Sequence, residues 1–480
     1  MKRILPVILT AIILCGACSK KPVDCNSLFI RLEKEFAAGN LSRTAELADS
    51  IGRLCSAEPS MRRKADSLAQ IADRILIDFP LTEKMIDRQL SEKTGPFTAE
   101  EKEFWDESGW LEWKIIDEEK RYFRRSAANL DLIRKFRQNR LLYDSLEASD
   151  PDLIFRRDHT KDIIRVAGKY GELSVPASMT LNYTITVDAD AVPPGELIRC
   201  WMPYPRENHL RQQNVVLLSA SPDYYLLSPD TMIHRSVYME SASVKGVPTV
   251  FKLSFSYESA GIWFDPRFIT ADPYNTQSGF YRRYTTEQLP HIVFSENIKA
   301  LTDSITGDLN DPAGIVKSIY YWICENILWT GAQEYSIIPC IPEYVIKHKR
   351  GDCGMQTFLL MSMLRYKGIP VRWQSGWMVP PGAENLHDWC EVYYEGTGWV
   401  PLDISYGLQH SEDRKIREFF ITGIDAYRLI INDGVARELF PEKTHLRSEP
   451  YDFQRGEVEW RKANLYFDKW DYNMEITYNK

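Results

Sequence analysis

The spacing of apolar residues changes along this chain, and each change limits which secondary structure can form. Over residues 25–165 apolar side chains recur at three- and four-residue intervals, as in Leu28-Phe29-Ile30-Arg31-Leu32, which indicates amphipathic helices. Over residues 174–264 the period falls to two, as in the run from Leu181 to Val187, with Pro and Gly between the runs. We therefore expect a helical domain followed by an antiparallel β-domain.

The rest of the chain returns to helical spacing and then changes to strand. Helices are expected over residues 313–327 and 353–366, and strand-like sequence dominates residues 371–404. Helix followed by sheet within one unit predicts an α+β class. We place this core at residues 290–430 and treat residues 431–480 as a C-terminal extension. A chain of 480 residues has room for roughly three such domains.

The first residues have the pattern of a targeting segment. Lys2 and Arg3 precede an apolar run from Ile4 to Leu14 that is too short to span a bilayer. The run ends in Leu-Cys-Gly-Ala-Cys-Ser, which is similar to a bacterial lipoprotein cleavage box and makes Cys18 the expected lipid-bearing residue. An ordinary signal peptide cut near the same place is the alternative. With residues 1–18 as a lipoprotein signal peptide, we expect an exported protein, lipid-anchored to the bacterial cell envelope at the outer membrane.

The charge balance argues against a nucleic-acid partner. The chain has 59 Lys and Arg against 67 Asp and Glu, a formal net charge of −8. Binding to phosphate backbones needs a clustered basic face, and no run of Lys and Arg supplies one. We therefore expect no nucleic acid among the partners.

Export also changes the interpretation of the cysteines. If Cys15 and Cys18 belong to the leader, 9 − 2 = 7 cysteines remain. An odd number outside the cytosol leaves at least one thiol unpaired within the chain, and such a thiol is a candidate nucleophile. A bridge between Cys25 and Cys55 and a pair of free buried thiols both fit the sequence, so this pairing stays open.

Cys353 is the thiol best placed for chemistry. It follows Gly351-Asp352 at the start of a predicted helix, where the partial positive charge and free N–H groups favour a thiolate. Asp352 is a good N-cap residue, but its negative charge opposes thiolate formation, so an imidazole must supply most of the activation. The backbone N–H of Cys353 is also a candidate donor to a developing oxyanion.

A predicted β-hairpin carries an imidazole and a carboxylate. His387 lies at the head of the first strand, Asp403 at the tail of the second, and residues 395–397 form a Gly-containing turn. If Tyr394 pairs with Gly398, Asp403 lies on the same face as His387, one diagonal step away. A register slip of one residue would send Asp403 to the other face.

Each of these residues has a simpler explanation when taken alone. Cys353 could be a small buried hydrophobe, His387 a structural histidine, and Asp403 a turn residue at a strand end. Their joint occurrence, in the order thiol, imidazole, carboxylate, favours a catalytic interpretation.

Four ordered motifs resemble the transglutaminase-like superfamily. They are Gly351-Asp352-Cys353, Arg365-Tyr366-Lys367-Gly368-Ile369-Pro370, His387-Asp388-Trp389 and Gly398-Trp399-Val400-Pro401-Leu402-Asp403. The close resemblance covers about residues 290–405. Residues 200–205 and 420–428 are also similar to segments of bacterial secreted members, whereas Ile404 stands where Pro or Thr is more usual.

The resemblance implies a papain-like α+β core and a set of catalytic roles. Cys353 would be the nucleophile, His387 the general base and acid, and Asp403 the residue that orients the imidazole. Trp329 is the candidate oxyanion donor through its indole N–H, with Gln333 as the rival and core packing as the other explanation for Trp329. No acidic cluster resembles the calcium sites of the animal enzymes, so we expect neither a metal nor a cofactor.

The implied half-reaction is attack of the Cys353 thiol on an amide carbonyl to give a thioester acyl-enzyme. Water as the second substrate makes a peptidase or amidase, and an amine makes a crosslinking transferase. We favour hydrolysis of a peptide, protein or peptidoglycan amide, because an exported lipoprotein meets such amides. A non-catalytic peptide- or glycan-binding lipoprotein is the competing class, and the helical domain could itself bind a protein partner.

Overall fold

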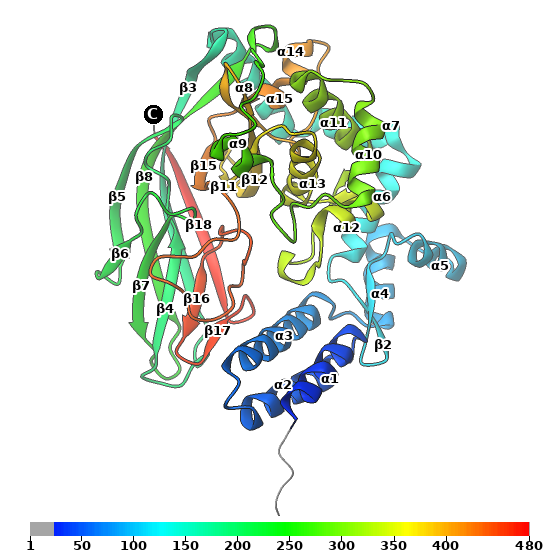
Figure 1. Cartoon of the computed structure of the whole chain (residues 1–480), viewed down its shortest axis with the longest axis vertical. Helices are drawn as coiled ribbons and strands as arrows, with labels where there is room; N and C mark the ends of the chain where they lie inside the picture. Colours follow the sequence, from blue (N-terminus) through cyan, green and yellow to red (C-terminus); the bar gives the residue numbers. More distant parts are fainter. Residues whose placement is uncertain (1–23, 480) are drawn as a thin grey trace, which may run out of the picture. The chain divides into compact units, whose positions relative to one another are not determined.

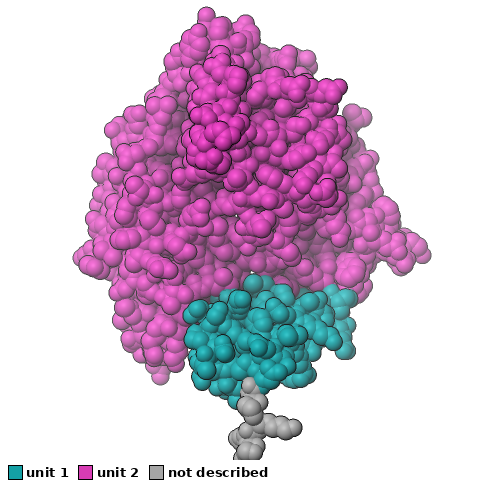
Figure 2. Space-filling view, viewed as in Figure 1, with its two compact units in different colours: residues 1–73, 115–119 teal, residues 74–114, 120–480 magenta. Residues whose placement is uncertain are grey.

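The computed structural model describes residues 24–479. The predicted leader over residues 1–18, including Cys18, lies outside the described residues. The chain divides into two compact units, residues 1–73 with 115–119 and residues 74–114 with 120–480 (Figure 2). No helix in the described part of the chain combines the length and apolarity needed to cross a membrane.

The first unit is a set of helices closed by a disulfide. It holds α1 (Cys25–Ala37), α2 (Leu41–Leu54) and the first part of α3 (Pro59–Asp78). Asp24 caps α1 by accepting the N–H of Ser27, and Leu32 and Ile51 are fully buried in the core. The Cys25–Cys55 bridge, which the sequence left open, is present.

Removing this bridge should weaken the first unit specifically. The two cysteines are separated by 30 residues, and constraining the unfolded chain over such a loop stabilises by about 3–4 kcal/mol. We expect replacement of both Cys25 and Cys55 by serine to lose that amount, measured by hydrogen exchange of α1 and α2 amides in urea. Cys340→Ser, which removes a half-buried free thiol, is the control. Unchanged protection of α1 and α2 in the double variant would contradict the prediction.

Five further helices follow in the second unit, and the chain between two of them forms a hairpin that apolar spacing did not predict, with residues 115–119 assigned to the first unit. The helices are α4 (Glu83–Thr94), α5 (Ala99–Glu107), α6 (Ser126–Gln138), α7 (Arg140–Ser149) and α8 (Pro151–Val166). Thr98 and Glu101 form a capping box that fixes the start of α5. Between α5 and α6 the chain forms a two-stranded sheet of β1 (Trp113–Ile116) and β2 (Glu119–Tyr122).

Two five-stranded sheets form the β-domain (Figure 1). The first part of the domain supplies β3 (Tyr170–Val187), β4 (Leu197–Pro203), β5 (Gln212–Ser221), β6 (Tyr225–Leu227), β7 (Ser236–Ala242) and β8 (Thr249–Phe264). Alternate residues of β3 such as Leu181 and Tyr183 share one buried core with Cys200 and Met202 of β4. This core explains the period-two spacing of residues 174–264.

Strands from the predicted C-terminal extension complete both sheets. They are β16 (Glu457–Trp460), β17 (Ala463–Leu465) and β18 (Trp470–Asn479). β18 pairs with β3 from Trp470 opposite Val187 to Asn479 opposite Ser178, and β16 pairs with β4. The last three strands of the chain are therefore part of the β-domain.

Between β8 and β16 the chain forms a layer of helices on a four-stranded sheet. Its main elements are α10 (Glu296–Thr306), α11 (Pro312–Asn326), α12 (Ile341–His348), α13 (Cys353–Tyr366), β11 (Val371–Met378), β12 (Asn385–Tyr394), β13 (Gly398–Leu402) and β15 (Arg428–Asn432). The sheet order is β13-β12-β11-β15. Buried α13 packs on this sheet, and its Phe358 stacks on Trp373 of β11 with ring centroids 4.4 Å apart. The predicted α+β class is confirmed.

Short elements connect these layers. They are η1 (Pro266–Phe268), α9 (Gly279–Thr285), β9 (Leu328–Trp329), η2 (Tyr335–Ile337), β10 (Arg350–Gly351), α14 (Arg414–Arg417), α15 (Phe419–Thr422) and β14 (Gly423–Ile424). β9 and β10 pair in parallel, with Trp329 opposite Gly351. This pairing brings Trp329 close to the start of α13.

Candidate functional site

The local sequence fixes Cys353 as the first residue of α13. Asp352 caps the helix by accepting the N–H of Met355 at 3.1 Å, and its carboxylate also accepts the Tyr335 hydroxyl at 2.6 Å. A Cβ atom on Gly351 would lie 2.8 Å from Cβ of Met355, so a side chain at this position would push the helix start aside. The Gly-x-Cys motif therefore has a steric reason in this fold.

Cys353 is half-buried and opens onto a cavity of about 340 Å³. The side chains that line the same cavity and can form hydrogen bonds include Trp329, Gln333, Tyr335, Asp352, Asp388 and Gln454. The thiol is therefore accessible to a small group that enters from this side.

The β12–β13 hairpin brings His387 and Asp403 together. Tyr394 pairs with Gly398, so the predicted register is confirmed. Nε2 of His387 lies 2.7 Å from Oδ2 of Asp403, and both side chains are buried. Backbone N–H groups of Ser405 and Tyr406 donate to the other carboxylate oxygen of Asp403.

Arg428 completes this pair, although no sequence motif assigned it a role. Its guanidinium, at the start of β15, lies 2.8 Å from Oδ2 of Asp403 and 2.8 Å from Oδ2 of Asp425. Burial acts to raise the pKa of Asp403, but His387 and Arg428 hold that pKa far below its ordinary value. Burial lowers the pKa of His387 from 6.5, although Asp403 acts to raise it. The imidazole is therefore neutral near pH 7.

The thiol itself is bound to Asp388. Its sulfur lies 3.4 Å from Oδ2 of Asp388, and no hydrogen bond joins Cys353 to His387 among the described residues. Neighbouring residues of a strand point to opposite faces. In β12 the side chain of Asp388 therefore faces α13, whereas His387 faces Asp403 on the other side.

This environment corrects the expectation that the helix start favours a thiolate. Burial, followed by the charges of Asp388 and Asp352, raises the pKa of the Cys353 thiol well above its ordinary value. In the sequence Asp388 stands out only as the middle residue of a His-x-Trp motif. Successive side chains of a strand point to opposite faces, so one of His387 and Asp388 had to face the buried helix that carries Cys353. That alternation is the signal that could have assigned Asp388 to the thiol.

The two oxyanion candidates differ in solvent exposure and in hydrogen bonding. Trp329 is 42% exposed, which argues against the core-packing explanation, and it lines the cavity of Cys353. Gln333 is buried, and its Nε2 donates to Oε2 of Glu112 at 2.8 Å. Of the two, Trp329 is the exposed residue, whereas the Gln333 amide is already bound to Glu112.

Comparison with known proteins identifies the part of the chain that carries these residues. The family model of the transglutaminase-like superfamily matches residues 299–404. These residues form a transglutaminase-like core. The match includes Cys353, His387 and Asp403, whereas Arg428 and Gln454 lie beyond it.

Individual relatives match parts of this chain. The chain is 26% identical over 140 residues to the uncharacterized protein YebA of Bacillus subtilis, and that stretch is 25% of this chain and 19% of YebA. The solved structure of a candidate cysteine protease from Cytophaga hutchinsonii covers 65% of this chain and 93% of its own, with a TM-score of 0.43 and 13% identity. The periplasmic domain of TgpA from Pseudomonas aeruginosa covers 55% and 95%, with a TM-score of 0.26 and 17% identity.

Proposed function

We propose that this protein is an exported thiol enzyme that acts on amide bonds, with Cys353 as nucleophile, His387 as general base and acid, and Asp403 as the orienting carboxylate. The observation that carries the proposal is the buried 2.7 Å contact between His387 and Asp403 on a strand whose next residue contacts the thiol. A neutral imidazole held by a carboxylate is the group that such a reaction requires.

In this structure the thiol is bound to Asp388 and the imidazole lies on the other face of β12, so the proposed reaction begins with a rearrangement that breaks the contact with Asp388 and brings the sulfur to the imidazole. The thiol proton passes to Nδ1 of His387, whose Nε2 is held by Asp403, and the sulfur attacks the amide carbonyl carbon. The C–N bond breaks, the leaving amine takes up a proton, and a thioester remains on Cys353. Water then attacks the thioester, the acid is released and the thiol regains its proton.

Hydrolysis of a peptide, protein or peptidoglycan amide is favoured over transfer to an amine because of where the protein is expected to act. The leader motif of residues 1–18 supports export, lipid attachment at Cys18 and a place at the outer membrane. Peptide and cell-wall amides are abundant there. The helical region offers a surface for a protein partner of the same compartment.

Trapping of the acyl-enzyme tests this proposal. The protein is treated with p-nitrophenyl acetate and, separately, with a peptide or peptidoglycan digest, quenched in acid, and the mass of the Cys353 peptide is read. We expect a thioester on Cys353 that hydroxylamine removes. Cys353→Ala should give no such adduct, and Cys340→Ser, at another half-buried thiol, should behave as the unmodified protein. No adduct on Cys353 from either source would overturn the proposal.

One observation favours a second function, a non-catalytic peptide- or glycan-binding lipoprotein. The hydrogen bond to Asp388 and the raised pKa of the thiol describe a cysteine that is unreactive at neutral pH. On this hypothesis a peptide or glycan fragment would bind in the cavity with the same affinity in Cys353→Ala. The trapping experiment separates the two functions, since only the enzyme forms a thioester.

A further inference from the structure

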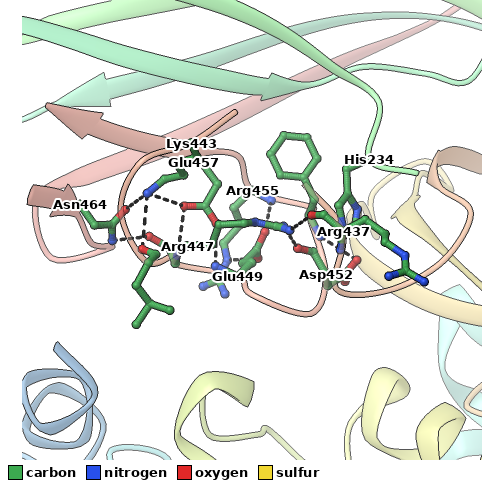
Figure 3. Close-up of polar contacts among 12 residues, drawn as sticks. His234, Arg437, Lys443, Arg447, Glu449, Asp452, Arg455, Glu457 and Asn464 are labelled. Carbon is green, nitrogen blue, oxygen red and sulfur yellow. Dashed lines mark hydrogen bonds and ion pairs between the residues drawn. The ribbon is translucent and has the colours of Figure 1, made fainter. Parts of the chain in front are cut away.

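A segment outside the transglutaminase-like core reaches the thiol. Residues 443–455 form a loop before β16, and ion pairs fix it at both ends (Figure 3). Lys443 and Arg447 pair with Glu457, and Lys443 also pairs with Glu459. At the other end Arg455 pairs with Glu449 and Glu334. The loop is therefore held by several buried charges.

Two residues of this loop hold Asp388. Nε2 of Gln454 donates to Oδ1 of Asp388 and to the backbone oxygen of His387, both at 2.8 Å. The carboxyl of Asp452 lies within hydrogen-bonding reach of the Asp388 carboxyl. Asp452 is itself fixed by the Ser375 hydroxyl at 2.5 Å and the Asn432 amide at 3.1 Å.

The two carboxyls are placed to share a proton. They are both buried, and no ion pair joins Asp388 to a cation in the described part of the chain. Burial, followed by the Asp452 charge, raises the pKa of Asp388 well above its ordinary value. The other groups that face this pair are Cys353 and Asp352 at the start of α13, Tyr335 of η2, and Arg447 beside Asp452. Two adjacent carboxylates cannot both remain charged at such a site, so one proton is retained.

We propose that Asp388 is a further catalytic acid of this site, which protonates the leaving amine, and that two residues position it: Asp452 keeps it protonated, and Gln454 keeps it directed at the thiol. The inference rests on the proposed function. It gives a reason for the 3.4 Å contact between Asp388 and the sulfur, which the roles of His387 and Asp403 leave unexplained.

The proton balance assigns one proton to each group. The thiol proton goes to His387 as the C–S bond forms, and the Asp388 proton goes to the amide nitrogen as the C–N bond breaks. Water then attacks the thioester and gives a proton to the Asp388 carboxylate. The C–S bond breaks, and the sulfur takes back the proton from the imidazolium of His387. Both groups return to their starting forms.

The first test measures control of the thiol by the carboxyl pair and needs no substrate. The rate of Cys353 alkylation by iodoacetamide is followed against pH by mass spectrometry of its peptide in the full chain. In Asp452→Asn, Asp388 loses the neighbour whose charge helps to keep it protonated, so a larger share of it is charged beside the sulfur. We expect the alkylation midpoint to rise by about one pH unit or more.

Asp388→Asn should shift that midpoint in the opposite direction, because it removes the carboxyl nearest the sulfur. Gln454→Leu should not raise the midpoint, since an N–H donor favours the charged carboxyl and its loss leaves Asp388 more protonated; Gln454→Asn is the conservative comparison. Glu103→Gln, an exposed change on α5, should leave the midpoint unchanged. Shifts of the two Asp→Asn variants in the same direction, or no shift in either, would overturn the inference.

The second test compares leaving groups. p-Nitrophenolate leaves without a proton, whereas p-nitroaniline needs one, so peptide p-nitrophenyl esters and p-nitroanilides of the same acyl group are used. Asp388→Asn should lower the anilide rate by about 10²–10⁴-fold and the ester rate by only a few-fold. Equal losses on both would overturn the inference while the proposed function stands. If the unmodified protein is not acylated on Cys353, the proposed function fails, and the acid role fails with it.

Discussion

Replacement of His387 by asparagine should lower the rate of Cys353 acylation by about 10²–10⁴-fold, because the thiol then has no base to take its proton. The thiol pKa is raised by burial and by Asp388 and Asp352, so spontaneous ionisation near pH 7 cannot replace the imidazole. The measurement is the burst of p-nitrophenol from p-nitrophenyl acetate. His410→Asn, which changes an exposed histidine paired with Glu147, is the control and should retain the burst.

The pH dependence of this burst follows from the pKa of His387. The imidazole acts as a base only when neutral, and burial lowers its pKa below 6.5. The burst rate should therefore fall to half its plateau only below pH 6.5. In His387→Asn the decrease should be absent. A burst that is already half lost above pH 6.5 would contradict the assignment of His387 as the base.

Arg428→Met should destabilise the fold by about 3–5 kcal/mol, because it leaves two buried carboxylates without their cation. Arg428 and Asp403 are fully buried, and Asp425 is nearly so. The measurement is urea unfolding followed by tryptophan fluorescence. Arg428→Lys should lose less because it keeps the charge. Arg414→Met, at an exposed pair with Glu418, should change stability by about 0.5 kcal/mol or less.

The loss in Arg428→Met should depend on pH in a definite direction. Asp403 and Asp425 both have lowered pKa values, with burial acting to raise them and Arg428 among the groups that lower them. A carboxyl whose pKa is lower in the folded than in the unfolded chain stabilises the fold above about pH 4. This stabilisation is lost as the pH falls through the pKa of the folded state. The difference between the variant and the unmodified protein should therefore shrink below pH 4. A difference that is constant from pH 7 to pH 3 would show that the guanidinium acts through packing alone.

The parts of the fold that the sequence predicts are those with local causes. Helix α13 begins at Cys353 and ends at Tyr366 as predicted, because Asp352 caps its start and Gly368 follows its end. The register of β12 and β13 follows from a short turn with two glycines. His387 and Asp403 therefore meet as the sequence predicts.

The parts that the sequence did not predict depend on distant contacts. β18 has alternating residues, but its partner β3 lies almost 300 positions earlier, and nothing local selects that partner. The hydrogen bond of Asp388 with Gln454 and the ion pair of Asp403 with Arg428 form only because the tertiary fold brings these distant residues together. The thiol's partner was missed for the same reason. The motif showed which residues lie in one strand, but the face that each presents to the helix depends on the assembled layers.

The pairing of β18 with β3 also has a consequence for biosynthesis. A ribosome that has translated the whole transglutaminase-like core has not yet made Asp452, Gln454 or the strand that closes the sheet beside β3. A nascent chain of that length carries Cys353, yet the loop that holds its neighbouring acid is missing. The surroundings of the sulfur are therefore completed only when the last residues of the chain have been made.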